Sequence, residues 1–334
     1  MNSARVQLLP RICLHEADAA IKLRQACCQD GPGFFYLKMS QEEAAIADQV
    51  LELSRCFFDL DLESKMALKN DTSHFFRYKG VRIPATGPGY RAVAGDANFK
   101  KDSRESFNIG RADIFEDDLL CPHGHTPWPH EGKIPGFRDA CERYASLLCS
   151  RSCDLRRCLA EALGAKRDHF DTPGLFDRSP WLLGMVHYNP TPSDVAQECF
   201  GIAPHQDDGI FTLLYTDGTP GLQICPSWHG SGMHRDREML NPNLEWQAVE
   251  PLPGHWIVNL GTQLSRWSGG RFRATLHRVV VDAERPAHRY SLPFFYEANL
   301  DAPLGCADAA TPGDILLQMA ERDGLPLLPE TPAS

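Results

Sequence analysis

The chain has 334 residues, of which 43% are hydrophobic and 9% aromatic, and it carries a formal charge of -10 at pH 7. This length allows one large or two medium domains, and the apolar fraction can fill a sizeable core, which excludes a disordered chain. The acidic balance, without any long block of like charges, argues against a protein that binds nucleic acid through its phosphates.

The cysteines and the first residues bear on the cellular compartment. The chain contains 12 cysteines, but several of them (Cys141, Cys149, Cys153 and Cys158) fall in a helical pattern without the Cys-x-x-Cys spacing of zinc or redox sites. Residues 1–5 lack the apolar core of a signal peptide, and no run of about 18 apolar residues predicts a membrane span. We therefore expect reduced thiols in a cytoplasmic monomer that binds neither membrane nor nucleic acid.

Helical patterns dominate the first half of the chain. Ser40 and Glu43 form the sequence of a capping box, in which the serine caps a helix and the glutamate reaches back to it. Apolar residues then recur every three to four positions through Phe57, which predicts a helix. A second long pattern spans 137–163 and ends at Gly164, a typical helix terminator. Further expected elements are a helix at 16–29, a strand at 34–37, a short helix at 63–68 and a helix at 312–321 capped by Thr311.

Three other stretches have the composition of loops. Residues 70–102 contain glycine and proline breakers with interleaved aromatics and arginines. We favour a loop packed over the core by its aromatics, with a wall of a substrate pocket as the alternative. The polar stretch 226–244 is either a lid or, in the simpler interpretation, a surface insertion. A cysteine and three histidines suggest a second metal site, but the prolines and glycines between them favour surface loop residues. These four are Cys121, His123, His125 and His130.

After about residue 180 the chain changes to short apolar segments separated by Gly, Pro and Asn turns. Many short strands of this kind predict a β-sandwich or barrel, and together with the preceding helices they predict an α+β protein. We expect a single domain over 1–334, with a mainly helical part at 1–179, a strand-rich core at 180–300 and a C-terminal segment at 301–334. The expected strands are 182–188, 210–215, 222–225, 245–249, 256–260, 276–282 and 289–296.

The residues with the clearest chemical meaning lie around His205 and Asp207. Alternate side chains of a strand point to one face, so these two would lie about 7 Å apart at Cα and could reach one metal ion together. His277, within a second β-branched run, would complete a set of two histidines and one carboxylate. Such a facial triad binds Fe(II) on one side and leaves the opposite positions open.

Nearby residues compete for the same role. Asp208 has odd parity in the same strand, so we expect a solvated or turn carboxylate on the other face. His255 and His288 are alternative third ligands, but both lie beside turn residues, which favours His277.

An anchor for an anion follows the third ligand. Arg289 and Ser291 come twelve residues after His277 and again share one face of a strand. They offer a planar guanidinium and a hydroxyl, a geometry that suits bidentate binding of a carboxylate. A charged side chain that points into a barrel needs a partner, so we expect an acidic ligand there.

These residues, in this order, resemble the isopenicillin N synthase-like family of Fe(II)- and 2-oxoglutarate-dependent oxygenases. The resemblance covers nearly the whole chain and implies a double-stranded β-helix core (a jelly roll, cupin-like) wrapped by N-terminal helices. It implies a dioxygenase that uses Fe(II), 2-oxoglutarate and O2 to hydroxylate, desaturate or cyclise a small organic molecule. The other shared segments are Gly33-Phe34-Phe35-Tyr36, Arg104-Glu105-Ser106-Phe107, Tyr188-Asn189-Pro190, Pro220-Gly221-Leu222-Gln223-Ile224 and Val258-Asn259-Leu260-Gly261.

The same resemblance suggests roles for the pocket residues. It assigns Arg289 and Ser291 to the distal carboxylate of 2-oxoglutarate. Tyr188 would donate a further hydrogen bond to it, although the extra Asn189 before Pro190 leaves these two residues as competitors.

The resemblance is weaker at three other positions. Phe295 and Asn108 match positions that contact substrate, with ordinary core duty as the alternative for each. Thr262 stands where many relatives have Asp after Asn-x-Gly, which concerns local support of the site. Two other functions stay open: an oxidase that keeps the Arg-x-Ser pair without consuming 2-oxoglutarate, as isopenicillin N synthase does, and a metal-binding scaffold without turnover.

Overall fold

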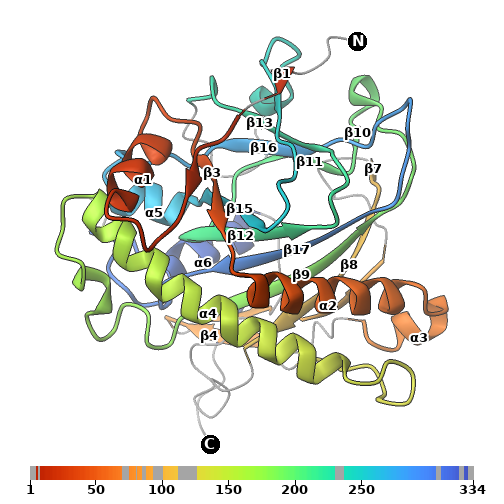
Figure 1. The fold of residues 1–334 in the computed structure, drawn as a ribbon. Coiled ribbons are helices and arrows are strands. Elements are labelled where there is room, and N and C mark those ends of the chain that lie inside the picture. The colour runs from red at the N-terminus through yellow and green to blue at the C-terminus, as the bar shows by residue number, and fades with distance from the viewer. Residues whose placement is uncertain are drawn as a thin grey trace, which may run out of the picture.

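In the computed structural model, two β-sheets face each other and helices cover the outer face of the larger one (Figure 1). Apolar side chains from both sheets meet in one buried cluster, among them Tyr36 and Val186 from the larger sheet and Ile224 and Val279 from the smaller. This is the expected jelly roll. The residues described are 5–6, 8–69, 75–79, 81–84, 88–92, 101–111, 126–229, 237–305, 310–322 and 327–329.

The larger sheet has eight strands in the order β2-β3-β15-β12-β17-β9-β8-β6, and the smaller has five in the order β1-β14-β13-β16-β11. The eight are β2 (Arg11–Ile12), β3 (Phe34–Lys38), β6 (Gly89–Arg91), β8 (Arg104–Gly110), β9 (Trp181–Tyr188), β12 (Phe211–Thr216), β15 (His255–Leu260) and β17 (Arg289–Tyr296). The five are β1 (Arg5–Val6), β11 (Ile202–His205), β13 (Leu222–Cys225), β14 (Gln247–Ala248) and β16 (Leu276–Val279). All seven strands expected after residue 180 are present, with small differences at their ends.

Five of the six described helices match the expected pattern, with small differences at their ends, and α5 was not expected. α2 and α4 pack on each other and on β17, and so cover the outer face of the eight-stranded sheet (Figure 1). Ser40 caps α2, and Glu43 completes the predicted capping box. Among the described helices, none is long and apolar enough to cross a membrane. The helices are α1 (Ala19–Cys27), α2 (Gln41–Phe58), α3 (Leu62–Met66), α4 (Phe137–Ala162), α5 (Thr262–Trp267) and α6 (Pro312–Arg322).

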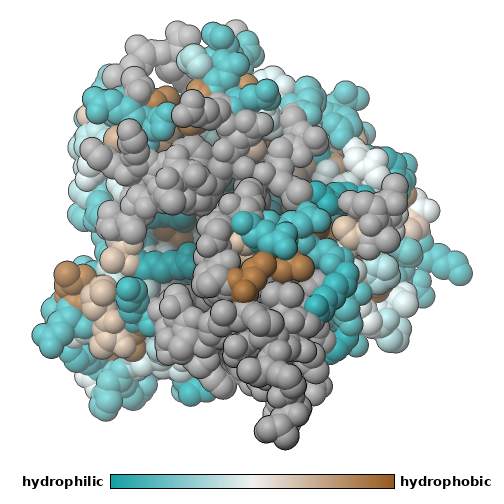
Figure 2. All heavy atoms as spheres, turned by 180° about the vertical axis from the view of Figure 1, so that it is seen from behind, coloured by the Kyte–Doolittle hydropathy of each residue, from teal (hydrophilic) through white to brown (hydrophobic). Residues whose placement is uncertain are grey.

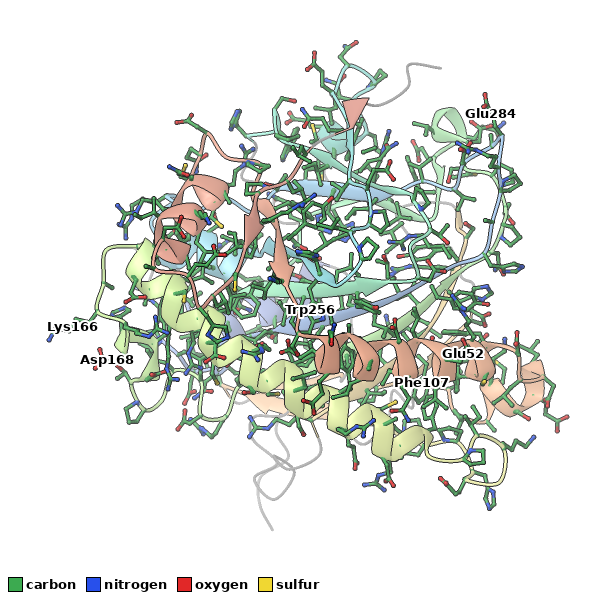
Figure 3. The ribbon with its side chains drawn as sticks, in the orientation of Figure 1. Glu52, Phe107, Lys166, Asp168, Trp256 and Glu284 are labelled. Atoms are coloured by element: carbon green, nitrogen blue, oxygen red, sulfur yellow. The ribbon has the colours of Figure 1, made fainter. Side chains whose placement is uncertain are left out.

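Strand alternation divides the eight-stranded sheet into two chemically different faces. On β17, Leu292, Phe294 and Tyr296 point outward into the core beneath the helices. The residues between them point inward, toward the smaller sheet. Trp256 and Phe107 are buried in the same outer core, whereas Glu52 lies on the exposed side of α2 (Figure 3). Figure 2 shows the face opposite to that of Figure 1, and the described residues on this face are mostly hydrophilic.

A buried polar network interrupts this outer core. Glu105 on β8 accepts hydrogen bonds from Lys65 Nζ (2.9 Å) and Tyr90 Oη (2.6 Å), and its other oxygen lies 2.8 Å from His187 Nδ1. The ring of His187 stacks on Tyr290 with a centroid distance of 4.6 Å. Both oxygens of the buried Glu105 carboxylate therefore have partners, as burial requires.

The interpretation of residues 70–102 as loop was wrong for the described part, which contains strands. Edge strands here are short and lie between glycines and prolines, so the sequence pattern is that of a loop. Tyr90 packs in the core, and Arg91 reaches the cavity described below, so both proposed roles of this stretch occur. The additional strands are β4 (Phe75–Tyr78), β5 (Val81–Pro84) and β7 (Lys101–Asp102), which pair with each other or with β10 (Cys199–Phe200) and β18 (Leu328–Pro329).

Two other expectations concern the organisation of the chain. The single domain stays a prediction, although strands from residues 34–110 share one sheet with strands from residues 181–296. All described cysteines are free thiols, as expected. Of the suggested second metal cluster, Cys121, His123 and His125 lie outside the described residues, and His130 is exposed.

Candidate active site

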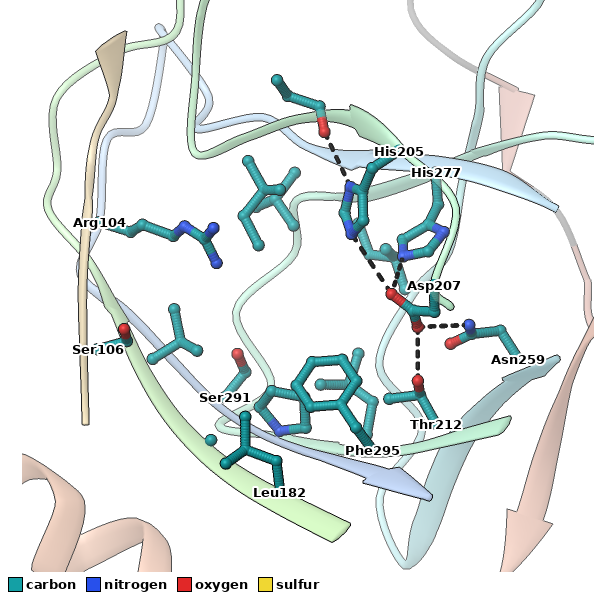
Figure 4. A pocket seen from close by; sticks show the side chains of 18 of the residues that line it. Arg104, Ser106, Leu182, His205, Asp207, Thr212, Asn259, His277, Ser291 and Phe295 are labelled. Carbon is teal, nitrogen blue, oxygen red and sulfur yellow. Dashed lines mark hydrogen bonds and ion pairs between the residues drawn. The ribbon is translucent and has the colours of Figure 1, made fainter. Parts of the chain in front are cut away.

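Three side chains that could bind a metal converge at one edge of the smaller sheet. His205 ends β11, His277 lies on β16, and the two are direct cross-strand partners. Asp207 Oδ1 lies 3.5 Å from His205 Nε2 and 3.6 Å from His277 Nε2. One ligand atom from each residue lies within 4.8 Å of the other two (Figure 4). Among the described residues this is the only such group of His, Cys, Asp or Glu.

The backbone orients both imidazoles toward this point. His205 Nδ1 lies 2.9 Å from the carbonyl of Ala203, and His277 Nδ1 lies 3.0 Å from that of Thr275. A ring that donates from Nδ1 leaves its Nε2 lone pair for a metal ion. Burial, together with the neighbouring His205, lowers the pKa of His277 to about 4. The His277 ring is thus neutral near pH 7, the form that binds metals.

Asp207 is held by two partners that the sequence analysis did not identify. Thr212 Oγ1 donates to Asp207 Oδ2 at 2.5 Å, and Asn259 Nδ2 donates to the same oxygen at 2.7 Å. Oδ1 therefore stays directed at the histidines (Figure 4). Burial works against ionisation, but His277, His205 and the Asn259 amide outweigh it and hold the pKa of Asp207 well below its usual range. The sequence held one indication of this role, because Asn259 is a polar residue within the otherwise apolar run 256–260.

The loop after β11 differs from the strand geometry that the sequence suggested. The strand ends at His205, so the alternation of faces does not extend to Asp207 and Asp208. The prediction that Asp208 points away from the site was wrong, because Asp208 also lines the cavity. Thr262, where relatives have Asp, supports this loop by donating from its backbone N to the Asp207 carbonyl (2.8 Å) and from Oγ1 to the Asp208 carbonyl (3.2 Å).

Arg289 lies at the start of β17 and is only 3% exposed. Its Nε donates to the carbonyl of Thr219 at 3.3 Å, and its guanidinium lies over the ring of Tyr188, 4.8 Å from the centroid. Nη1 is buried and has no hydrogen-bond partner among the described residues. A buried charged donor without a partner is costly, so the site is suited to an acidic ligand.

A cavity of about 580 Å³ connects the metal-binding cluster with this arginine. The volume is within the usual range for small-molecule sites. Ser291 and Phe295, both predicted, line it from β17, and the predicted Tyr188 and Asn108 line it from β9 and β8. Asn189 is not among the described lining residues.

The strand register orders this wall of the cavity. Arg289 and Arg104 both pair with Tyr188, one on each side of β9. Further along, Phe295 pairs with Thr212, the residue that holds Asp207. The arginines thus lie at one end of the wall and the metal-binding cluster at the other, and Figure 4 shows Arg104 facing the cluster across the cavity. Arg104 and Ser106 were not predicted as lining residues, although the alternation of polar and apolar residues in 106–109 was a signal for a strand here.

The alternative histidine ligands lie elsewhere. His255 Nδ1 is 2.9 Å from the carbonyl of Pro253, and its ring contacts Tyr36. His288 Nδ1 is 2.8 Å from His187 Nε2, on the outer face of the sheet. Of the polar stretch 226–244, residues 230–236 lie outside the described residues, so its role as lid or insertion stays open.

Comparisons with known proteins agree with this site. Residues 182–298 match the 2OG-Fe(II) oxygenase superfamily, and residues 9–131 match the family of the non-haem dioxygenase in morphine synthesis N-terminal region. Azadirone synthase from Melia azedarach is 32% identical over 302 residues, which cover 89% of this chain and 82% of that protein. Homoarginine-6-hydroxylase from Oryza sativa subsp. japonica is 30% identical over 300 residues, which cover 84% and 78%.

A solved structure shows the same fold. The full-length Neurospora crassa protein in complex with alpha-KG and thymine superimposes with a TM-score of 0.73 at 23% identity, covering 96% of this chain and 100% of that one. The alignments with the two sequence relatives cover most of this chain and most of each relative. The chain therefore belongs to the 2OG-Fe(II) oxygenase superfamily, in its isopenicillin N synthase-like branch, and is an Fe(II)- and 2-oxoglutarate-dependent dioxygenase.

Proposed function

We propose that His205, Asp207 and His277 bind Fe(II) and that Arg289 and Ser291 bind the distal carboxylate of 2-oxoglutarate. The observation that carries this proposal is a cavity that joins three convergent ligand atoms to a buried guanidinium, one nitrogen of which has no partner among the described residues. Two imidazoles and one carboxylate are the donor set that suits ferrous iron with open positions. When bound, iron and 2-oxoglutarate supply the oxidising chemistry, in which O2 is consumed and 2-oxoglutarate becomes succinate and carbon dioxide.

The residues of the chain act by positioning and by excluding water. Thr212 and Asn259 direct one oxygen of Asp207 toward the metal position, because they occupy the other oxygen. Arg289, held by Thr219 and Tyr188, places the acidic co-substrate with its keto acid end toward the histidines. Phe295 and Leu182 provide apolar walls that favour a small organic substrate beside the metal position.

We propose hydroxylation of a small organic molecule as the reaction, with desaturation or ring closure as outcomes of different substrate placement. Tyr188 is proposed as a further contact of 2-oxoglutarate, and Asn108 and Phe295 as contacts of the substrate. All three line the same cavity. We also keep the proposals of a cytoplasmic monomer that forms a single domain and has no membrane or nucleic-acid partner. The acidic composition supports the last of these, since it disfavours binding to phosphates.

The test is an anaerobic titration of Fe(II)-loaded protein with 2-oxoglutarate, followed by its visible charge-transfer band, with succinate release measured separately in air. Wild type is expected to give both signals. Arg289→Gln should keep Fe(II) binding but bind 2-oxoglutarate roughly 10- to 100-fold more weakly, since a hydrogen bond to a charged group contributes about 1.5–3 kcal/mol.

Arg278→Gln is a matched control. Arg278 lies on β16 next to His277, but it bonds Gln223 at 2.9 Å and stacks on Trp246, away from the cavity. Its loss should leave the affinity for 2-oxoglutarate unchanged. Oxygen uptake without succinate would support the oxidase alternative, and absence of the band would support the inactive scaffold.

A further inference from the structure

Glu297 is a carboxyl group in the cavity wall that the proposed roles above do not use. The inward-facing positions of β17 continue past the end of the strand, from Arg289 through Phe295 to Glu297, and all three line the cavity. Ser179 Oγ donates to the Glu297 carbonyl at 2.5 Å, which fixes the backbone there.

Gly209 allows the backbone at Tyr296 and Glu297 to lie close to the loop that carries Asp207. A Cβ added to Gly209 would lie 2.7 Å from the Tyr296 carbonyl oxygen and 3.3 Å from Glu297 Cγ. No larger residue could occupy position 209 without moving the backbone apart. Glu297 is therefore at the metal end of the cavity, beside Asp208.

One oxygen of the Glu297 carboxyl lacks a hydrogen-bond partner in the part of the chain that the structure describes. This oxygen, Oε2, is buried. Burial and, to a smaller extent, the nearby Asp208 together raise the pKa of Glu297 to about 8. An ionised carboxylate in this position is stable only if a positive or hydrogen-donating group approaches from the cavity.

Basic and acidic side chains are distributed unequally along the cavity. Arg91, Arg104 and Arg289 line one end, where they favour acidic groups. Asp208 and Glu297 line the other end, next to the metal position. The two positive charges of Fe(II) would be offset there by Asp207 and by the keto acid carboxylate of 2-oxoglutarate, while the distal carboxylate would be offset by Arg289. A basic group of the substrate is therefore attracted to the Glu297 end and repelled from the arginines.

We propose that Glu297 binds a basic nitrogen of the substrate, an ammonium or guanidinium group, and so selects basic molecules over neutral molecules of the same shape. This inference rests on the proposed function, because it places the substrate beside the Fe(II) ligands. A charge-assisted hydrogen bond to the carboxylate supplies both the affinity and the orientation of the substrate.

The test compares pairs of probes that differ in charge but hardly in shape: L-arginine with L-citrulline, butylguanidine with butylurea, and hexylamine with hexanol. Binding is measured anaerobically by calorimetry on protein loaded with Fe(II) and 2-oxoglutarate. At least one basic member should bind roughly 10-fold more tightly than its neutral partner. Glu297→Gln should abolish this preference and leave the charge-transfer band of the Fe(II) and 2-oxoglutarate complex unchanged.

Two further measurements separate the possible failures. Glu297→Gln should unfold at or above the wild-type temperature, because one oxygen of the carboxyl it replaces has no hydrogen-bond partner among the described residues, whereas a structural role would lower that temperature. Glu297→Asp keeps the charge and should keep part of the preference. If the band forms but no basic probe is preferred, or if Glu297→Gln retains the preference, this inference is wrong and the proposed function stands. If wild type gives neither band nor succinate, the proposed function itself fails.

Discussion

Asn259 offers the most direct test of how the site is built. Its side chain is 3% exposed and donates to Asp207 Oδ2 at 2.7 Å, the oxygen that does not face the histidines. In Asn259→Ala, Thr212 is the one remaining donor to that oxygen among the described residues. The carboxylate can then rotate, and its Oδ1 is no longer fixed toward the metal position.

The expected magnitude follows from the kind of bond that is lost. A hydrogen bond to a charged group contributes about 1.5–3 kcal/mol, which corresponds to roughly a 10- to 100-fold change in an equilibrium constant. Loss of a group that orients a metal ligand typically weakens metal binding by a similar factor of about 10–100. We therefore expect the Kd for Fe(II) of Asn259→Ala to rise roughly 10- to 100-fold. Thr212→Val, which keeps the β-branched shape, should have a similar effect.

The assay is anaerobic calorimetric titration with Fe(II), and the control is Asn299→Ala. Asn299 is equally buried, at 1% exposure, and likewise donates to a carboxylate, Asp177 Oδ1, at 2.6 Å. Its loss should lower thermal stability without changing the affinity for Fe(II). Wild-type affinity in Asn259→Ala, or equal losses in both variants, would refute the reasoning.

Three further predictions concern stability. Ser40→Ala removes the cap of α2 and should lower the free energy of unfolding in urea by about 1 kcal/mol; an unchanged midpoint would contradict the role of the capping box. Burial opposes ionisation of Glu105, but hydrogen bonds from its three partners lower its pKa to about 2, so its contribution of about 3 kcal/mol is present above the unfolded-state pKa and lost as pH falls from about 5 to 2. The stability difference between wild type and Glu105→Gln should therefore shrink between pH 7 and pH 3, and a constant difference would count against this. Removal of metal with a chelator should lower the unfolding temperature and added Fe(II) should restore it, since 100-fold excess over Kd stabilises by about 2.7 kcal/mol, whereas Asp207→Ala should show no such shift.

The chemistry of the site was more predictable than its supports. His205, Asp207 and His277 stand out because imidazole and carboxylate groups are common metal ligands, and the structure brings their ligand atoms within 4.8 Å of one another. Thr212 and Asn259 are ordinary strand residues, and only the pairing of β12 with β15 brings both of them to Asp207. A contact of this kind depends on register across the sheet, which a single sequence does not state.

The parity argument succeeded for one strand and failed for another, for a physical reason. β17 runs unbroken from Arg289 to Tyr296, so alternation correctly brings Ser291 and Phe295 to the face of Arg289. β11 ends at His205, and the loop beyond it turns both Asp207 and Asp208 toward the cavity. Alternation is valid only while the ladder of hydrogen bonds continues.

The two faces of β17 explain why stability and chemistry can vary separately in this protein. Leu292, Phe294 and Tyr296 pack outward against the helical layer, where truncation of a large side chain removes apolar burial and leaves a cavity. Ser291 and Glu297 lie on the inner side and line the cavity. Substitution on the inner face can therefore change which substrate binds at little cost in folding, and this separation permits relatives with one scaffold to act on different small molecules.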